Sequence, residues 1–309
     1  MTVNAEFDDP SDWQGELLDP KNDYVFKRVF GEDPALLVSL INDLRPDLPE
    51  IRSVEILNPG INAEELRGKY IVLDVLARDA EGHAYNIEIQ VRRYGAWHQR
   101  ALYYLARMLA TQLDAGEDYD RLRAAVGIHL LDFDLFTETP EQCAQALWRF
   151  EMRDAHQPQV TLGNQLQLTL IELKKADRLR QGAGPLGDWV SFFEHWREEQ
   201  IMTEIEHAPI REALNRVHRL SADEEARRMA FVRERALRDE VSLLKEAREE
   251  GREEGREEGR EEGREKGREE GRLEAARNTA RNLIALGGLS DGQIAQATGL
   301  TLEQVEALH

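Results

Sequence analysis

Three polar side chains within residues 69–90 have the types and the spacing of a site for a divalent metal ion. Asp74 is the only charged residue of the apolar segment 71–77, which predicts a strand covered on both faces. Glu88 and Gln90 follow in an alternating segment and share one face of a second strand, about 7 Å apart. A buried lone carboxylate is costly, so such an acid is paired, protonated or bound to metal. Because Mg²⁺ prefers carboxylate oxygens, the set predicts a magnesium site.

The turn between the two strands decides whether Asp74 lies beside Glu88. A three-residue loop, 80–82, ends on a glycine where left-handed backbone is needed. That loop sets Asp74 directly opposite Glu88, with Cβ atoms about 5 Å apart. A two-residue loop would set Asp74 opposite Ile89 and turn it to the other face. We predict the three-residue loop, and with it the register that brings the two carboxylates together.

Phosphodiester hydrolysis is the chemistry that such a set supports best, because a bound Mg²⁺ both activates water and absorbs charge at phosphorus. Asp74 and Glu88 form a minimal ligand pair, and the main-chain carbonyl of Ile89 could add a third oxygen. Gln90 lies beside them and could orient the attacking water.

Alternating helices and strands are predicted around this hairpin. Asn22 and Asp33 are typical N-caps, and the second is followed by Pro34 in the first helical turn. A central sheet with helices on its faces, an α/β fold, is the expected architecture. The main further elements are helices over 95–113 and near 188–197, and strands within 51–62, 123–133 and 165–173.

The composition bounds the class of protein. Hydrophobic residues make up 41% of the 309 residues, which is enough for a proper core. No apolar run approaches the roughly 20 residues that span a bilayer, and the acidic N-terminus does not resemble a signal peptide, so we expect a cytoplasmic protein. The single cysteine, Cys143, excludes an internal disulfide and a cysteine-based zinc site. The net charge of −20 argues against a generally basic nucleic-acid binder but not against a local basic groove.

Five regions are predicted along the chain. They are a flexible N-terminus (1–18), the α/β domain (19–200), a helical segment (201–250), a Gly-Arg-Glu-Glu repeat spacer (251–272) and a small helical tail (273–309).

The repeat and the tail each leave two interpretations open. Glycines every four residues could form a stripe that lets two helices approach, or mark a solvated spacer. In the tail, Ser290 and Thr301 are predicted caps of a helix-turn-helix outline. Glu303 and Glu306 lie where a recognition helix would carry arginines, which favours docking or homo-oligomerisation over DNA readout.

The hairpin, an aspartate followed by a turn and then Glu-x-Gln, resembles the active-site core of the PD-(D/E)XK nuclease superfamily. Within it, the chain is similar to the transposase-associated, recombination-promoting nuclease family over roughly residues 19–200. The resemblance implies a restriction-endonuclease-like mixed sheet and a Mg²⁺-dependent DNA endonuclease linked to recombination or transposition. The motifs that carry it are N-D-Y-V-F-K-R-V-F-G at 22–31, I-E-I-Q at 87–90, R-A-L-Y-Y at 100–104, the strand near 126–133, and I-E-L-K-K at 171–175.

The resemblance also assigns roles to the site residues. It implies that Asp74 and Glu88 are the metal ligands and that Gln90 stands where the wider superfamily has lysine. Glutamine carries no charge, so stabilisation of the transition state falls to the metal or to another cation, with Lys27 and Lys69 as candidates. The alternatives to an endonuclease are a decayed, nuclease-like protein that self-associates through its tail, and a DNA-binding module that does not cleave.

Other chemistry-bearing residues are predicted to be structural. Glu172 and Lys174 form a literal Glu-x-Lys, which we interpret as an ion pair at the end of a strand. Asp23 is a helix-terminal charge rather than an additional catalytic acid. Tyr103 and Tyr104 are predicted to pack rather than to stack on bases. The histidines show no metal-ligand spacing and are expected in a turn, on the surface and in a strand; they are His83, His98 and His129.

Overall fold

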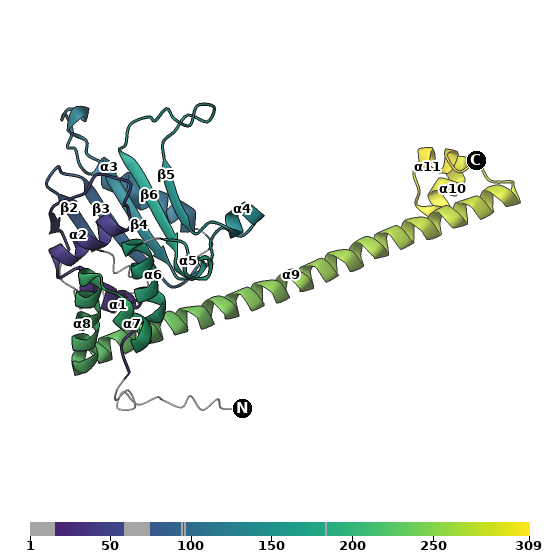
Figure 1. Cartoon of the computed structure of the whole chain (residues 1–309). Coiled ribbons are helices and arrows are strands. Elements are labelled where there is room, and N and C mark those ends of the chain that lie inside the picture. The colour runs from purple at the N-terminus through teal and green to yellow at the C-terminus, as the bar shows by residue number, and fades with distance from the viewer. Residues whose placement is uncertain (1–15, 59–74, 94, 96, 183) are drawn as a thin grey trace. The chain divides into compact units, whose positions relative to one another are not determined.

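A six-stranded mixed sheet of described residues lies at the centre of the computed structural model (Figure 1). Strands β3, β4 and β6 are parallel to one another, whereas β1, β2 and β5 each run antiparallel to a neighbour. This is the predicted α/β architecture, consistent with a restriction-endonuclease-like fold. In sheet order the strands are β1 (Val54–Ile56), β2 (Val75–Asp79), β3 (Ala84–Gln90), β4 (Ala125–Leu131), β6 (Leu166–Glu172) and β5 (Leu147–Glu151). The structure describes residues 16–58, 75–93, 95, 97–182 and 184–309.

The helices begin where the sequence supplies caps. The Asn22 side chain accepts from the N–H groups of the first turn of α1, and Asp33 does the same for α2, which starts at Pro34. Both predicted caps are therefore confirmed. The helices are α1 (Asp23–Phe30), α2 (Pro34–Asp43), α3 (Trp97–Ala110), α4 (Pro140–Cys143), α5 (Leu173–Leu179), α6 (Pro185–His195), α7 (Glu199–Glu204), α8 (Ala208–Ala222), α9 (Glu224–Leu286), α10 (Asp291–Thr298) and α11 (Leu302–Glu306).

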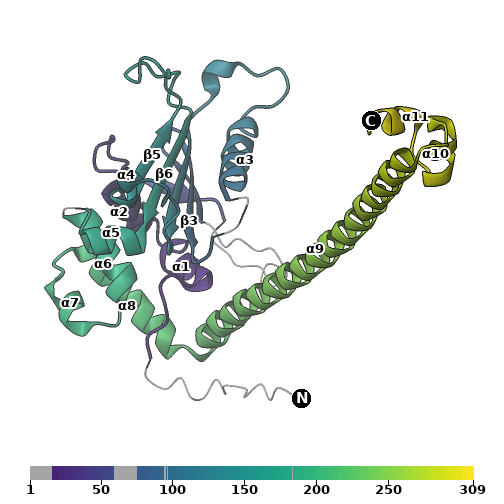
Figure 2. The same ribbon diagram turned by 90° about the vertical axis from the view of Figure 1, so that its right-hand side faces the viewer.

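Each face of the sheet has its own hydrophobic core. Figure 2 shows α3 on one side of the sheet and α2 and α6 on the other. Helices α1, α2, α6 and α8 cover one face, where Ile87 and Ile89 of β3 lie in the larger core. Helix α3 covers the other face through Trp97, Ala101 and Leu105. Because side chains alternate along a strand, the polar residues of β3 point toward α3.

The hairpin between β2 and β3 has the predicted three-residue loop. Val75 pairs with Ile87 and Arg78 with Ala84, and the Asp79 N–H donates to a carbonyl oxygen across the turn at 3.1 Å. The last loop residue, Gly82, has φ +89°, the left-handed conformation that glycine adopts without strain. Asp74 lies outside the described residues, as does the first part of the predicted strand 71–77.

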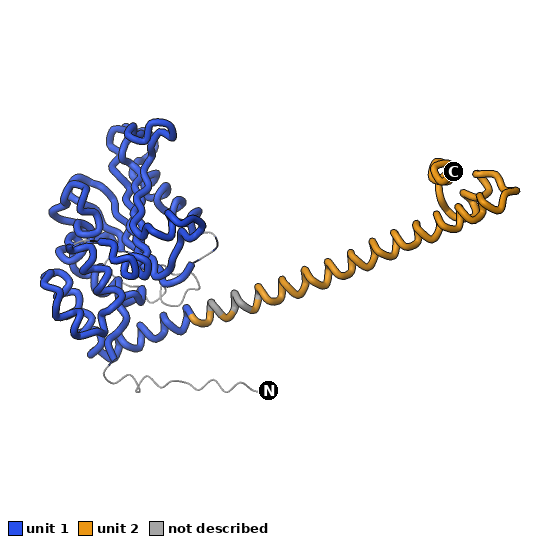
Figure 3. The backbone as a smooth tube through the Cα atoms, turned by 45° about the vertical axis from the view of Figure 1, so that its right-hand side comes forward, with its two compact units in different colours: residues 1–237 blue, residues 238–309 orange. Residues whose placement is uncertain are grey.

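The chain divides into two compact units, residues 1–237 and 238–309 (Figure 3). Helix α9 continues through the Gly-Arg-Glu-Glu repeat without a break. A Cβ built on any of the six repeat glycines would meet no atom within 4 Å, apart from the nearby backbone of its own helix. Among the described residues, no helix is long and apolar enough to cross a membrane.

The second unit ends in a small helical module with its own core. Ser290 and Thr301 each form a capping box, so both predicted caps are confirmed, and Gly299 closes α10 with a φ of +74°. Three leucines of the module remain exposed. The core residues are Ala280, Ile294, Leu300 and Val305, and the exposed residues are Leu286, Leu289 and Leu302.

Candidate functional site

Glu88 is the centre of a buried polar cluster between β3 and α3. Its side chain accepts a hydrogen bond from Gln90 Nε2 at 2.7 Å and another from Arg100 Nη2 at 3.0 Å, both at Oε1. His129 Nδ1 lies 3.3 Å from Oε2, close enough for an ion pair but without hydrogen-bond geometry. Glu88 is 5% exposed and Gln90 7% exposed. The cluster therefore holds one carboxylate among an arginine, a histidine and an amide, away from bulk water.

The parallel pairing of β3 with β4 places His129 beside Glu88. The two residues are direct partners in the register, and the Trp97 ring covers the imidazole edge to face at 5.4 Å. Gly127 leaves room for this ring, because a Cβ there would lie 3.2 Å from His129 Nε2 and 2.9 Å from Leu168 Cδ1. The glycine therefore leaves room for a buried imidazole beside the carboxylate.

The surroundings of Glu88 keep it ionised. Burial alone would raise the pKa of this carboxyl, but His129, Arg100 and the Gln90 amide outweigh burial and hold the pKa below its usual range. The carboxylate is thus charged at neutral pH, the form in which it binds a cation. Arg100 supplies a cation at this site, where the sequence predicted Lys27 or Lys69 instead.

Of the two predicted cations, the described one, Lys27, does not lie at the cluster. Lys27 lies in α1, which packs on the opposite face of the sheet, and no hydrogen bond or ion pair of its side chain is found among the described residues. Lys69 lies outside the described residues. Within the part of the chain that the structure describes, Arg100 is the side chain that brings positive charge to Glu88 from a helix.

Two amide oxygens near Glu88 have no partner among the described residues. The Gln90 amide donates to Glu88, which leaves its Oε1 buried and without a hydrogen bond, and Asn86 Oδ1 is in the same state. Buried polar atoms are almost always satisfied, so these two oxygens are candidates to accept from water or to bind a cation. Amide and carboxylate oxygens are hard ligands, so Glu88 and Gln90 fit a hard divalent cation such as Mg²⁺.

The structure thus brings together two of the three predicted site residues. Glu88 and Gln90 share one face at the carboxyl end of β3, as predicted. Asp74 is outside the described residues. Arg100 and His129 were missed as site residues. Arg100 lies at the edge of the helical pattern of residues 95–113 and could have been suspected, whereas His129 depends on a strand pairing that no local pattern reveals.

The literal Glu-x-Lys is structural, but its pairing differs from the prediction. Glu172 is fully buried and pairs with Lys175 Nζ at 2.6 Å, not with Lys174, which pairs with Asp132 at 3.0 Å. The first turn of α5 follows Glu172 directly, so position 175 rather than 174 turns back toward it. The remaining bonds to the Glu172 oxygens come from the Leu135 and Phe136 N–H groups and the Trp148 indole.

Asp23 and the tyrosines of α3 also have clear environments. Asp23, at the start of α1, forms an ion pair with Arg233 of α9, which supports its interpretation as a helix-terminal charge. Tyr103 and Tyr104 are 61% and 44% exposed, so the prediction that they pack is wrong. The core on this face of the sheet takes up Trp97, Ala101 and Leu105 of α3 and leaves the two tyrosines outside it.

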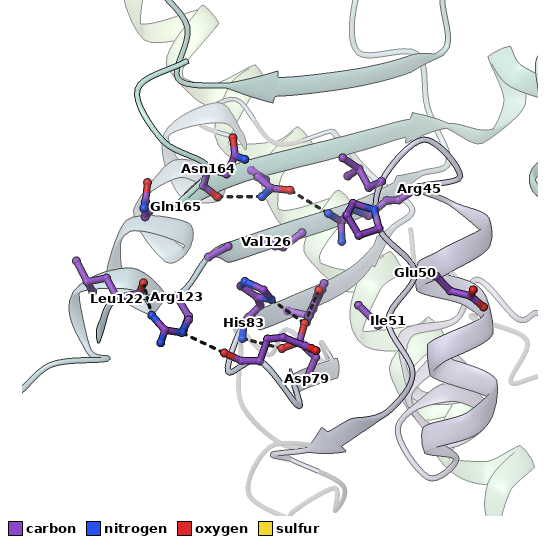
Figure 4. Close-up of a pocket in the computed structure, with 16 residues that line it drawn as sticks. Arg45, Glu50, Ile51, Asp79, His83, Leu122, Arg123, Val126, Asn164 and Gln165 are labelled. Atoms are coloured by element: carbon purple, nitrogen blue, oxygen red, sulfur yellow. Dashed lines mark hydrogen bonds and ion pairs between the residues drawn. The ribbon is translucent and has the colours of Figure 1, made fainter. Parts of the chain in front are cut away.

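A separate pocket of about 510 Å³ lies at the turn end of the hairpin (Figure 4). Asp79, Glu81 and His83 place potential metal-ligand atoms within 4.8 Å of one another there. The Asp79 carboxylate already accepts from the His83 N–H and from the Tyr85 hydroxyl, and its second oxygen lies 2.9 Å from His83 Nδ1. These contacts lock the turn. Five residues of strand, about 16 Å, separate His83 from Glu88, so this pocket is distinct from the Glu88 cluster.

Comparison with known families identifies the chain. A family model described as a PD-(D/E)XK nuclease family transposase matches residues 20–247, well over half of the 309 residues. Searches of curated proteins and of solved structures gave no match. The matched region includes Ala213, Val217 and Ala226 of α8 and α9, which belong to the larger core. The fold, the Glu-x-Gln on β3 and the family match agree, and the chain belongs to the PD-(D/E)XK nuclease family transposases.

Proposed function

We propose that this protein is a metal-dependent DNA endonuclease with its active site at the carboxyl end of β3. The observation that carries the proposal is a buried, ionised Glu88 beside the unpartnered oxygen of Gln90. Family membership supports a nuclease-type hydrolase. The choice of DNA as substrate, of Mg²⁺ as the ion and of recombination or transposition as the setting is part of the proposal.

The ligands proposed for the metal are Asp74 and Glu88. The observed register ends at the pair Val75 and Ile87, and its continuation by one residue would set the two acids opposite each other. A Mg²⁺ ion bound there would act as a Lewis acid and lower the pKa of a bound water. Glu88 contributes a fixed negative charge that needs no deprotonation at neutral pH.

The remaining groups would act on water and on the phosphate. Gln90 is held by its bond to Glu88, so its Oε1 has a fixed direction in which it can accept a hydrogen bond from the attacking water and orient it. Arg100 is 32% exposed at its side chain and so can reach both Glu88 and a phosphate at the mouth of the cluster. A guanidinium stabilises the charge that develops on phosphorus oxygens. Arg100 thereby takes the electrostatic part that the uncharged Gln90 cannot play.

The test is plasmid nicking in Mg²⁺ by the full chain, by Asp74→Ala and by Glu88→Ala, each repeated in EDTA. The proposal predicts nicking by the wild type but by neither Asp74→Ala nor Glu88→Ala, and only with metal. Arg121→Ala serves as a matched control, because Arg121 is exposed and pairs with Glu117 far along the chain from the cluster. Equal nicking by all four proteins would show a contaminating nuclease. Absence of nicking by a folded wild type would favour the decayed, non-enzymatic alternative.

We further propose that the helical tail mediates self-association. Leu286 is 81% exposed and Leu302 49% exposed, beside a small core that is already formed within one chain. Sedimentation of the full chain and of Leu286→Ser/Leu302→Ser tests this proposal. A wild-type oligomer that the double variant loses would support it, and a wild-type monomer would contradict it.

A further inference from the structure

Helix α3 presents a stripe of aromatic and basic side chains to solvent, and the stripe begins at the Glu88 cluster. Arg100, Tyr103, Tyr104 and Arg107 follow the spacing i, i+3, i+4, i+7, which lines one side of a helix. Arg100 contacts Glu88, and the two tyrosines lie one turn further along, about 5 Å away along the axis. The stripe therefore leads directly away from the proposed cleavage site.

The exposure of these aromatic rings is unusual for their size. Tyr103 is 61% and Tyr104 44% exposed, and Leu102 beside them is 58% exposed. The two tyrosine rings meet edge to face with centroids 5.6 Å apart. No other aromatic ring contact of Tyr103 or Tyr104 is found among the described residues. Large exposed aromatic surface next to a functional site marks a binding surface rather than ordinary surface composition.

The charge around the stripe favours a polyanion as its partner. The chain has 60 acidic residues in 309, yet the segment 91–113 contains four arginines and no aspartate or glutamate. Arg107 is exposed, and no ion pair of its side chain is found among the residues that the structure describes. Acidic residues return at 114–120, beyond the end of α3. The basic stretch thus covers α3 and the residues just before it, and ends where the helix ends.

A second copy of this chain fits the stripe less well. In a two-fold contact between two copies of α3, Arg100 and Arg107 at the two ends of the stripe would lie against Arg107 and Arg100 of the other copy. The repulsion between these like charges costs free energy. A nucleic acid instead supplies phosphates for the arginines and flat bases for the tyrosines. In a duplex the base faces are covered by their neighbours, whereas in an unpaired strand they are free to stack on aromatic side chains.

We infer that the exposed stripe of α3, Tyr103, Tyr104 and Arg107, is a stacking platform for an unpaired DNA segment next to the scissile phosphate. The two rings take successive bases and Arg107 takes a phosphate between or beside them. This inference rests on the proposed nuclease function and deepens it, because it makes a nicked, frayed or otherwise unpaired strand the preferred substrate of the same site.

The experiment measures binding without cleavage. Fluorescence anisotropy in EDTA compares labelled oligo(dT) with a duplex of equal length, using the full chain, Tyr103→Leu/Tyr104→Leu and Tyr103→Phe/Tyr104→Phe. The phenylalanine variant keeps both rings and is the matched control. Because both positions are exposed, neither pair of changes removes core contacts. Circular dichroism and thermal melting confirm that the variants are folded.

The expected result is tighter binding of oligo(dT) than of duplex by the wild type. The leucine variant should lose about fivefold or more in oligo(dT) affinity for each ring removed, and the phenylalanine variant should bind as the wild type does. Arg107→Gln should weaken binding and reduce the slope of log K against log salt by about 0.7. Each of these three results supports a separate part of the platform.

Several results would overturn the inference. They are failure of the wild type to bind oligo(dT), equal binding by the leucine and wild-type proteins, and equal losses in the leucine and phenylalanine variants. A change from dimer to monomer in the leucine variant on sedimentation would show that a second copy covers the stripe. Ring-dependent binding without any nicking would refute only the endonuclease proposal, and nicking without ring-dependent binding would refute only the platform.

Discussion

Arg100 Nη2 lies 3.0 Å from Glu88 Oε1 and joins helix α3 to the carboxyl end of β3. The cation at this site, Arg100, therefore comes from helix α3 and not from β3, the strand that carries Glu88. In the superfamily that the chain resembles, a lysine two residues after the acid stands on the strand itself, where this chain has Gln90. The contact shows how a Glu-x-Gln strand can still have a positive charge at its carboxylate.

Replacement of Arg100 tests whether this charge serves catalysis. Arg100→Gln should lower the rate of Mg²⁺-dependent nicking about 10²- to 10³-fold, the usual effect of removing one donor to a developing charge. Arg100→Lys should recover part of the rate, because an ammonium keeps the charge but not the planar geometry. Single-turnover rates at saturating DNA separate this effect from weaker binding.

The matched control for Arg100 is Arg121→Ala, which removes an exposed arginine from an ion pair outside the cluster. Its nicking rate should equal that of the wild type. If Arg100→Gln nicks at the wild-type rate and melts at the same temperature, Arg100 has no part in the reaction and the cation must be sought elsewhere.

The buried pair of Glu172 and Lys175 is predicted to stabilise the fold without taking part in cleavage. Lys175→Met leaves the Glu172 carboxylate charged and buried without its cation, which should cost about 3–5 kcal/mol in the free energy of unfolding. Lys174→Ala removes a half-exposed partner of Asp132 and should cost about 1 kcal/mol or less. Urea denaturation measures both values.

A double variant keeps this prediction open to refutation if Lys175→Met does not fold. Glu172→Gln/Lys175→Met removes both charges and should recover much of the lost stability, since no uncompensated charge remains. Nicking per folded molecule should be unchanged in Lys174→Ala. A specific loss of nicking in that folded variant would make the literal Glu-x-Lys a catalytic motif after all.

The raised pKa of Asp19 predicts that the free energy of unfolding falls as the pH rises through mildly acidic values. Burial raises the pKa of its carboxyl from 3.8 to about 6, even though the Lys21 N–H donates to it at 2.8 Å. A folded-state pKa above the unfolded value means that the folded state holds the proton more tightly. This contribution to stability is complete below about pH 4 and is lost as the pH rises to about 6, by up to about 3 kcal/mol.

Asp19→Asn isolates this effect because asparagine keeps the oxygen that accepts from Lys21 but does not titrate. Urea unfolding of both proteins between pH 3.5 and 7 gives the difference in stability as a function of pH. The wild type should lose stability relative to the variant across the window from about pH 4 to about pH 6. A difference that does not change with pH would mean that the Asp19 carboxyl titrates alike in the folded and unfolded states.

The sequence predicted the hairpin well because its determinants are local. Loop length, the glycine at position 82 and the alternation of β3 set the register from Val75 to Ile87, and the structure confirms each of these. Helix ends were equally predictable at Asn22 and Asp33, where one side chain caps one helix.

The surroundings of the acid could not be predicted in the same way. His129 lies beside Glu88 through the parallel pairing of β3 with β4, although the two residues are 41 positions apart in the sequence. Lys175 rather than Lys174 pairs with Glu172 because helix α5 starts immediately after the strand. The exact residue at which a strand ends and a helix begins is not evident from the local sequence pattern. Tyr104 was predicted to pack, and it is exposed instead. Helical periodicity indicates which side of a helix faces the core, but not how wide the part of that side is that the sheet covers.

The most direct test of the central claim is the rate of Mg²⁺-dependent plasmid nicking by Glu88→Gln relative to the wild type. Glutamine has nearly the shape of glutamate but cannot carry the charge that a metal requires. With both proteins shown to be folded, we predict a rate at least about 10²-fold lower for the variant, and none in EDTA for either. Nicking by Glu88→Gln at the wild-type rate would contradict the claim that this carboxylate forms the active site.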